Sequence, residues 1–200
     1  MKILEKNQFE VASNIVRNGG LIAFPTETVF GLGVIYNDKE AYDRLVRVKR
    51  RPPEKPFTLM CGKVDDIDRF AIVSPVARKL INKFMPGQFT IILKAKPGLP
   101  SWVVSKEGNV GIRVSSDELV SNLIIKAGEP LLVPSANKSG EPPLTIDRDV
   151  IDVFSSEVDA IIKGESTSNV PSTIVLVDDS LHIIRLGLIT EEDIAKAIKE

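Results

Sequence analysis

The stretch Leu21-Ile22-Ala23-Phe24-Pro25-Thr26-Glu27-Thr28 joins a short apolar run to a polar turn. An apolar run of this length that ends at a proline is typical of a buried strand. The residues before it show helical spacing of apolar side chains and end at Gly19-Gly20, and glycine commonly follows a helix. A second helical pattern begins after Asp38, whose carboxylate can cap it. The chain therefore begins with a helix, a buried strand and a second helix.

Further along the chain, short apolar runs alternate irregularly with helical patterns. Helices are expected over residues 74–84, from Asp117 and from Thr190. Strands are expected at residues 57–60, 89–95, 110–114, 131–133, 160–162, 173–177 and 181–184, and two pairs of them are spaced like hairpins. This order favours an α/β fold with a mixed sheet flanked by helices over a doubly wound parallel sheet. Because the sequence has neither an internal repeat nor a low-complexity linker, residues 1–200 are expected to form a single domain.

The composition is that of a globular protein, with 43% hydrophobic and 26% charged residues. No apolar run has the length of a membrane span, and the first residues lack the apolar region of a secretory signal, so we expect a cytoplasmic protein without a membrane partner. Cys61 is the only cysteine and His182 the only histidine, which excludes a disulfide framework and a Cys/His zinc site within one chain. We expect a buried, inert thiol at Cys61 and a structural or surface imidazole at His182.

Basic residues are concentrated in one short segment, although the net charge of −1 argues against a protein that coats nucleic acid. Residues 44–55 contain six basic residues and one acid. The helix that begins after Asp38 must stop before Pro52-Pro53, so the cluster lies at a helix end and in the loop beyond it. Guanidinium and ammonium groups held there could bind the phosphates of a polyanion, whereas the plainer alternative is a solvated basic face. Neither a dinucleotide fingerprint nor a P-loop motif occurs in the sequence, so side chains would have to hold any nucleotide.

Small hydroxyl and amide residues adjoin several of the expected strands. They are Thr26, Thr28, Ser135, Asn137, Ser139, Ser172 and Thr173. Strand ends are where α/β folds commonly bind ligands, and hydroxyl groups there can bind a polar substrate. Ordinary turn and cap chemistry would select the same residue types, so both interpretations stay open at this level.

Several of these segments, taken in order, resemble the YrdC-like threonylcarbamoyl-AMP synthase family over residues 8–190. The matching motifs are Pro25-Thr26-Glu27-Thr28-Val29-Phe30-Gly31-Leu32-Gly33, Lys49-x-Arg51-Pro52 with Lys55-Pro56, Pro86-Gly87, Gly111-Ile112-Arg113, Pro134-Ser135-Ala136-Asn137-x-Ser139-Gly140, Pro171-Ser172-Thr173 and Arg185-x-Gly187. Each motif is weak alone, but their joint order is specific.

The resemblance implies a twisted mixed β-sheet flanked by helices around a large basic cavity. It also implies a nucleotidyltransferase that forms L-threonylcarbamoyladenylate and pyrophosphate from L-threonine, bicarbonate and ATP. The threonylcarbamoyl group would then pass to tRNA through partner threonylcarbamoyltransferase proteins. Adenylate formation mainly needs positioned reactants and a neutralised triphosphate, which suits a chain with one histidine and one cysteine. Mg²⁺ would be bound through the ATP phosphates, without metal ligands from protein side chains.

The resemblance also assigns individual residues. Those matched to ATP binding are Lys49, Arg51, Lys55, Asn109, Asn137, Thr145 and Arg185, with Lys49 and Arg51 as the catalytic pair. Those matched to threonine binding are Thr28, Arg113, Ser135 and Ser172, with Arg113 suited to the carboxylate.

Two departures from the family pattern accompany these assignments. Met60 stands where some relatives have a histidine that contacts threonine, and Met85-Pro86-Gly87-Gln88 replaces Trp-Pro-Gly-Pro. Longer relatives append a second domain, so this chain is expected to be the short form. One alternative is a module that binds tRNA or double-stranded RNA through the basic cavity, because basic side chains alone do not separate a triphosphate from an RNA backbone. Another is the same adenylation fold acting on carbamoyl phosphate.

Overall fold

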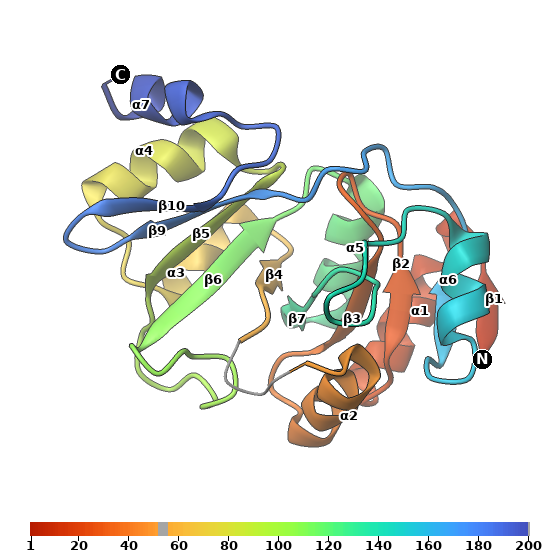
Figure 1. Ribbon diagram of the computed structural model, residues 1–200. Helices are drawn as coiled ribbons and strands as arrows, with labels where there is room; N and C mark the ends of the chain where they lie inside the picture. Colours follow the sequence, from red (N-terminus) through yellow and green to blue (C-terminus); the bar gives the residue numbers. More distant parts are fainter. Residues whose placement is uncertain (52–55, 200) are drawn as a thin grey trace.

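The computed structural model describes residues 1–51 and 56–199, and the expected ATP-binding residue Lys55 lies outside these residues. One ten-stranded sheet runs through the molecule (Figure 1). Its strands, in chain order, are β1 (Lys2–Leu4), β2 (Ile22–Phe24), β3 (Gly31–Ile35), β4 (Leu59–Cys61), β5 (Phe89–Lys94), β6 (Asn109–Val114), β7 (Leu131–Leu132), β8 (Ala160–Ile162), β9 (Thr173–Val177) and β10 (Leu181–Arg185). The spatial order is β1-β8-β2-β3-β7-β4-β6-β5-β9-β10.

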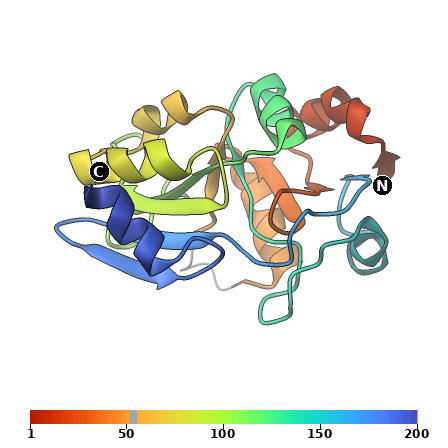
Figure 2. The same cartoon turned by 90° about the horizontal axis from the view of Figure 1, so that it is seen from above.

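The sheet is mixed, as the sequence predicts. Parallel pairs join β1 to β8, β8 to β2, β4 to β6 and β5 to β9, and the other neighbours are antiparallel. The two expected hairpin-like pairs are confirmed as the antiparallel pairs β5–β6 and β9–β10. The termini lie at opposite ends of the sheet (Figure 2).

Helices pack on both faces of the sheet. The α-helices are α1 (Phe9–Arg17), α2 (Lys39–Lys49), α3 (Ile67–Phe70), α4 (Pro75–Phe84), α5 (Glu118–Ala127), α6 (Asp147–Phe154) and α7 (Glu191–Lys199), with 3-10 turns at Lys6–Gln8 and Val64–Asp66. The expected cap at Asp38 is confirmed, and the side chains of Ser74 and Asp117 likewise each accept a backbone N–H in the first turn of α4 and α5. Helix α2 ends at Lys49, before the two prolines, as predicted.

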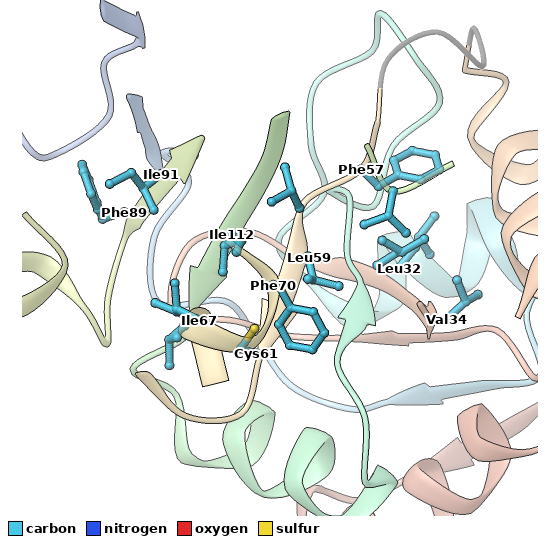
Figure 3. Close-up of a cluster of buried hydrophobic side chains, with 14 of the residues drawn as sticks. Leu32, Val34, Phe57, Leu59, Cys61, Ile67, Phe70, Phe89, Ile91 and Ile112 are labelled. Atoms are coloured by element: carbon cyan, nitrogen blue, oxygen red, sulfur yellow. The ribbon is translucent and has the colours of Figure 1, made fainter. Parts of the chain in front are cut away.

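Two apolar clusters form the core, one on each face of the sheet. Strand β2 contributes to both, because alternate side chains of a strand point to opposite faces. Ile22 and Phe24 pack with α1 and α5, whereas Leu21 and Ala23 join the larger cluster with α2, α4 and α6. Figure 3 shows part of the larger cluster, in which Leu59 of β4 and Ile112 of β6 lie between the helices. The larger cluster packs against one face of β5, β6 and β9, and residues on their other face, such as Thr90, Arg113 and Ile174, line the cavity described below.

Strands β1 and β3 and helices α3 and α6 were not among the predicted elements. Strand β3 contains Gly31 and Gly33, which weaken strand propensity, yet the fold requires both glycines. A Cβ at Gly31 would lie 2.7 Å from a methyl group of Val133, and one at Gly33 would lie 2.6 Å from the Phe24 ring. The Gly-Leu-Gly motif therefore lets a buried aromatic ring pack directly on the backbone of the neighbouring strand.

The two residues set aside in the sequence analysis behave as expected. Cys61 is buried in β4, and burial raises the pKa of its thiol far above the ordinary value, so the thiol is protonated and inert. His182 lies at the surface on β10, with its Nε2 2.7 Å from Ser180 Oγ. None of the helices within residues 1–51 and 56–199 has the length and apolar character needed to cross a bilayer.

Candidate functional site

Polar side chains from several strand ends converge on one cavity of about 150 Å³. Six of the predicted site residues line it, namely Thr28, Arg51, Arg113, Ser135, Ser172 and Arg185. They come from segments far apart in sequence that the sheet order brings together, since β6, β5 and β9 are neighbours and β3, β7 and β4 lie beside them. Among the described lining residues, the charged side chains are three arginines. The cavity therefore combines positive charge with hydroxyl groups.

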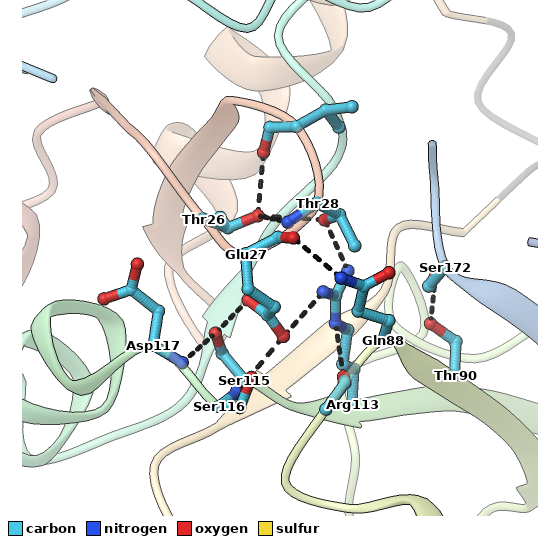
Figure 4. Close-up of polar contacts among 12 residues, drawn as sticks. Thr26, Glu27, Thr28, Gln88, Thr90, Arg113, Ser115, Ser116, Asp117 and Ser172 are labelled. Atoms are coloured by element: carbon cyan, nitrogen blue, oxygen red, sulfur yellow. Dashed lines mark hydrogen bonds and ion pairs between the residues drawn. The ribbon is translucent and has the colours of Figure 1, made fainter. Parts of the chain in front are cut away.

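Arg113 projects from β6 and uses three guanidinium nitrogens on three neighbours (Figure 4). Nε donates to Gly87 O at 3.2 Å, and Nη1 donates to Thr28 Oγ1 at 3.0 Å. Nη2 lies 2.8 Å from Glu27 Oε1, which makes a buried ion pair, but the N–H direction is too far off line for a hydrogen bond. Arg113 is thus fixed in place by two hydrogen bonds and a buried ion pair, and Nη2 has no hydrogen-bond partner among the described residues.

Glu27 is a site residue that the sequence reasoning did not single out. Its carboxylate accepts hydrogen bonds from Ser115 Oγ and from Ser116 N, the latter at 3.2 Å, and it pairs with Arg113. Burial of a carboxylate is costly unless charge and hydrogen bonds compensate it, and these contacts supply both. Gln88 Nε2 also donates to Glu27 O at 2.9 Å. The available signal was an acid between two threonines directly after a buried strand.

The turn after β2 orients Thr28 through its neighbour Thr26. Thr26 Oγ1 lies 2.9 Å from Thr28 Oγ1, accepts from Thr28 N at 3.0 Å and contacts Val29 O at 2.8 Å. A hydroxyl that bonds the backbone two residues on is ordinary turn chemistry, so Thr26 fits the structural interpretation. Thr28 instead lines the cavity beside Arg113.

Ser172 and Arg185 line the same cavity as Thr28 and contact each other. Arg185 Nε and Nη2 both donate to Ser172 O, at 3.0 Å and 2.9 Å. Ser172 Oγ lies 2.9 Å from Thr90 Oγ1. Burial and the nearby charge of Arg113 lower the pKa of Arg185.

Gly187 explains the spacing of the Arg185-x-Gly187 motif. A Cβ at this position would lie 2.3 Å from Pro171 O and 2.8 Å from Thr173 N, and neither backbone atom can move aside cheaply. Gly187 N also donates to Thr173 Oγ1 at 2.8 Å. Only glycine lets the segment after β10 approach β9 closely enough for Arg185 to reach Ser172.

Lys49 is buried beneath the loop that follows β7 and is not among the lining residues. Its Nζ donates to Ser135 O at 2.7 Å and to both Asn137 O and Asn137 Oδ1 at 2.8 Å. Ser135 Oγ donates to Asn137 Oδ1 at 2.6 Å. Burial and the charges of Arg51 and Lys138 lower the pKa of Lys49 to about 8. In this structure Lys49 fixes Ser135 and Asn137 from below.

Arg51 enters the cavity just beyond the end of α2. Its Cζ lies 5.1 Å from the centre of the Phe57 ring, and Nη2 donates to Pro56 O at 3.3 Å. Stacking on an aromatic face orients a guanidinium without neutralising its charge. Burial lowers the pKa of Arg51, although the side chain remains cationic at neutral pH.

Asn109 and Thr145 are not among the described lining residues. Asn109 begins β6, four residues before Arg113, which corresponds to roughly 13 Å along an extended strand. Thr145 lies in the loop before α6, where its carbonyl accepts from Ser166 N at 2.8 Å. Their assignment to ATP binding stays a prediction, as does that of Lys55.

Several known proteins are similar to this chain in sequence. The family model that matches is Sua5/YciO/YrdC, described as "Telomere recombination", and it covers residues 14–187. A protein of Methanocaldococcus jannaschii, provisionally named a threonylcarbamoyl-AMP synthase, is 34% identical over 98% of this chain and 96% of its own length. A threonylcarbamoyl-AMP synthase of Pyrococcus abyssi is 32% identical over 98% of this chain and 59% of its own length. YciO of Escherichia coli, an uncharacterised protein, is 33% identical over 88% of this chain and 87% of its own length.

Solved structures agree with the sequence relatives. The crystal structure of P. abyssi Sua5 complexed with L-threonine has a TM-score of 0.92 and 30% identity over 99% of this chain. This chain spans 61% of that longer protein. The crystal structure of E. coli YciO has a TM-score of 0.85 and 30% identity over 94% of this chain and 95% of its own. The fold, the extent of the family match and the identity to relatives of similar length agree, and the chain is a member of the Sua5/YciO/YrdC family.

Proposed function

We propose that this protein is a threonylcarbamoyl-AMP synthase, a nucleotidyltransferase that acts as a single YrdC-like domain. The observation that carries the proposal is the convergence of Arg51, Arg113 and Arg185 with Thr28, Ser135 and Ser172 on one cavity. Guanidinium groups suit the carboxylate and phosphates of the substrates, and hydroxyl groups suit an amino acid with a hydroxyl side chain. Relatives named as synthases and the threonine complex of Sua5 support the same assignment.

Threonine is assigned to the side of the cavity formed by Arg113, Thr28, Ser135 and Ser172. The buried Nη2 of Arg113, which lacks a hydrogen-bond acceptor of good geometry among the described residues, is suited to the substrate carboxylate. The hydroxyl groups of Thr28 and Ser172 both line the cavity and can bind the threonine hydroxyl. A buried polar group left unpaired by the wrong substrate is a strong source of selectivity.

ATP is assigned to the side reached by Arg51 and Arg185. Lys49 holds Ser135 and Asn137 in position and adds positive charge close to the cavity. Asn109, Thr145 and Lys55 complete the proposed ATP set. Mg²⁺ would be held by the ATP phosphates, because this ion usually binds through substrate phosphates and waters and needs no dedicated protein site. The ion would supply charge neutralisation at the triphosphate.

The proposed reaction joins three substrates. The amine of threonine and bicarbonate give a carbamate with loss of water. A carbamate oxygen then attacks the α-phosphorus of ATP, the bond to the β-phosphate oxygen breaks, and pyrophosphate leaves with its electron pair. The residues of this chain hold the two reactants side by side and neutralise the triphosphate, which is where rate acceleration in such displacements originates. The product would supply the threonylcarbamoyl group that partner proteins transfer to tRNA.

Pyrophosphate release tests this function. The purified protein should release pyrophosphate from ATP only when L-threonine and bicarbonate are both present, and serine, which lacks the methyl group, should be a poorer substrate. The kcat/KM for serine should be lower than that for threonine by about 10-fold or more, which is the usual contribution of one apolar group in a fitted pocket. Equal release in the absence of threonine or bicarbonate would refute the proposal. The test is informative because YciO, which has no assigned activity, is about as similar to this chain as the named synthases are.

The RNA-binding alternative is not favoured. A cavity lined by hydroxyl groups and a fixed arginine suits small polar substrates, whereas a phosphodiester backbone is usually held by exposed basic side chains. RNA binding that is tight, strongly salt-dependent and unaffected by ATP would reverse this preference. Replacement of ATP and bicarbonate by carbamoyl phosphate would test the other alternative in the same assay.

A further inference from the structure

Two lysines tie the C-terminal end of α2 to the loop of residues 133–141. Lys49, at the end of the helix, donates to the carbonyl oxygens of Ser135 and Asn137 in the loop. Lys138, in the loop, reaches back and donates to Val48 O in the helix at 3.0 Å. We call Lys49 and Lys138 the lysine clasp. The proposed function uses Lys49 and gives Lys138 no role.

The clasp completes the hydrogen bonding at the helix end. The last four carbonyls of an α-helix have no partner within the helix and need one elsewhere. At α2, the carbonyls of Val46 and Arg47 accept from the turn that follows, and Lys49 O accepts from Ser139 N at 2.9 Å. The remaining carbonyl, that of Val48, accepts from Lys138 Nζ. Lys138 is therefore the side chain that satisfies the last open carbonyl of the helix.

Lys138 is buried in a way that fixes its position. Its ammonium pairs with Glu157, which precedes β8, and lies 4.5 Å from the centre of the Phe154 ring of α6. A buried ammonium costs several kcal/mol unless it is paired and hydrogen-bonded, and these contacts meet that requirement. Lys138 thus joins three separate parts of the fold at one atom, namely α2, the 133–141 loop and the segment between α6 and β8.

The location matters because the C-terminal end of a helix attracts cations and repels anions. The end of α2 points toward the segment that carries Arg51 into the cavity, where the proposed triphosphate would bind. The ammonium group of Lys138 on Val48 O opposes the partial negative charge there, and that of Lys49 lies on the loop carbonyls of Ser135 and Asn137. Arg50, in the left-handed conformation with φ 50°, then turns the chain toward the cavity.

We propose that Lys138, held by Glu157, is a positioning residue that fixes the end of α2 and thereby places Arg51 and Lys49 for anion binding. The expected effect on anion binding is inferred only from the contacts of the lysine clasp. Its consequence for catalysis, a higher KM for ATP with an unchanged KM for threonine, rests on the proposed function.

The test uses inorganic tripolyphosphate as the probe and isothermal titration calorimetry as the readout. Lys138→Met removes the ammonium. The double variant Lys138→Met/Glu157→Met removes both charges, so the net charge is unchanged, and apolar replacement of a buried ion pair commonly preserves folding. The matched control is Arg44→Met, which also removes one positive charge from a link between α2 and this same segment. Arg44 lies 2.5 Å from Asp159 and donates to Glu157 O at 2.9 Å, well before the helix end.

The Kd for tripolyphosphate should rise about 10-fold in both Lys138 variants, the loss expected when a charge-assisted hydrogen bond to the anion is misplaced. Arg44→Met should stay within about 2-fold of the unchanged protein. A double variant that regains normal affinity would overturn the proposal, because charge alone would then explain the effect. An equal loss in Arg44→Met, or no tripolyphosphate binding by the unchanged protein, would overturn it as well. None of these outcomes depends on pyrophosphate release, so the inference and the proposed function can fail separately.

Discussion

Replacement of Arg113 by lysine tests whether threonine and ATP bind to different residues of the proposed site. Arg113 contacts Gly87, Thr28 and Glu27 with three nitrogens in fixed directions, and Nη2 has no hydrogen-bond partner among the described residues. A lysine retains the positive charge that Glu27 requires but has a single ammonium group. The variant should therefore fold, because the buried carboxylate of Glu27 still has a cationic partner. Its ammonium group cannot bind the threonine carboxylate as a planar guanidinium does.

The size of the effect follows from the contacts. Loss of one charge-assisted hydrogen bond to the threonine carboxylate costs about 1.5–3 kcal/mol, which corresponds to roughly 10-fold to 150-fold in binding. The KM for threonine should rise by that factor. The KM for ATP should change less than about 3-fold, because lysine keeps the positive charge near Arg185 and the hydrogen bonds that are lost go to Gly87 and Thr28.

Initial rates of pyrophosphate release, measured with each substrate varied in turn, provide the assay. Because Arg185 donates to Ser172 O on the proposed threonine side, the matched control is Arg51→Lys, at a residue that lines the same cavity and is assigned to ATP. It should raise the KM for ATP and leave the KM for threonine nearly unchanged. If the two variants changed the KM for threonine and the KM for ATP equally, the assignment of threonine and ATP to different parts of the cavity would be refuted. Loss of folding in Arg113→Lys, judged by circular dichroism, would refute the view that a lysine can serve Glu27.

Three further predictions concern Lys49, Gly187 and Arg50. Because the pKa of Lys49 is lowered from 10.5 to about 8, its ammonium deprotonates in the folded protein as pH rises through that value. The affinity for tripolyphosphate, measured by calorimetric titration, should therefore fall as the pH rises through about 8, and it should not fall in Lys49→Arg. The free energy of unfolding should increase from about pH 8 toward 10.5, because the unfolded chain binds more protons than the folded protein over this range. An affinity that does not change with pH would contradict this prediction. Gly187→Ala should lower Tm by roughly 2–12 °C, whereas Gly111→Ala, whose Cβ would meet only ordinary contacts, should change Tm little. Equal shifts in the two thermal scans would contradict the close-approach argument. Arg50→Gly should raise the free energy of unfolding by up to about 1 kcal/mol in urea titrations, because glycine relieves the left-handed backbone, and a clear loss would contradict that.

The strongly patterned parts of the fold could be predicted from sequence. Asp38, Ser74 and Asp117 mark helix starts through side-chain chemistry that acts locally, so their effect is visible without the tertiary structure. Strand β3 could not be predicted in the same way. Its glycines oppose strand propensity, and the need for them comes from the Phe24 ring of the neighbouring strand, which is a tertiary contact.

The candidate site could likewise be predicted from the sequence only in part. Strand-end hydroxyl groups could be grouped from sequence because strand ends meet at the edge of a sheet, and Thr28, Ser135 and Ser172 do share one cavity. The roles of Glu27 and Lys138 could not be predicted. Each depends on partners more than 15 residues away, Ser115 and Arg113 for the acid and Val48 and Glu157 for the lysine, and no local pattern encodes such pairings.

The origin of the carbon atom in the product tests the central claim most directly. ATP, L-threonine and ¹³C-labelled bicarbonate should be incubated with the protein, and the adenylate should be detected by mass spectrometry. The account predicts a threonylcarbamoyl-adenylate that carries the label from bicarbonate. Pyrophosphate release without a labelled adenylate, or an adenylate that forms without bicarbonate, would contradict it.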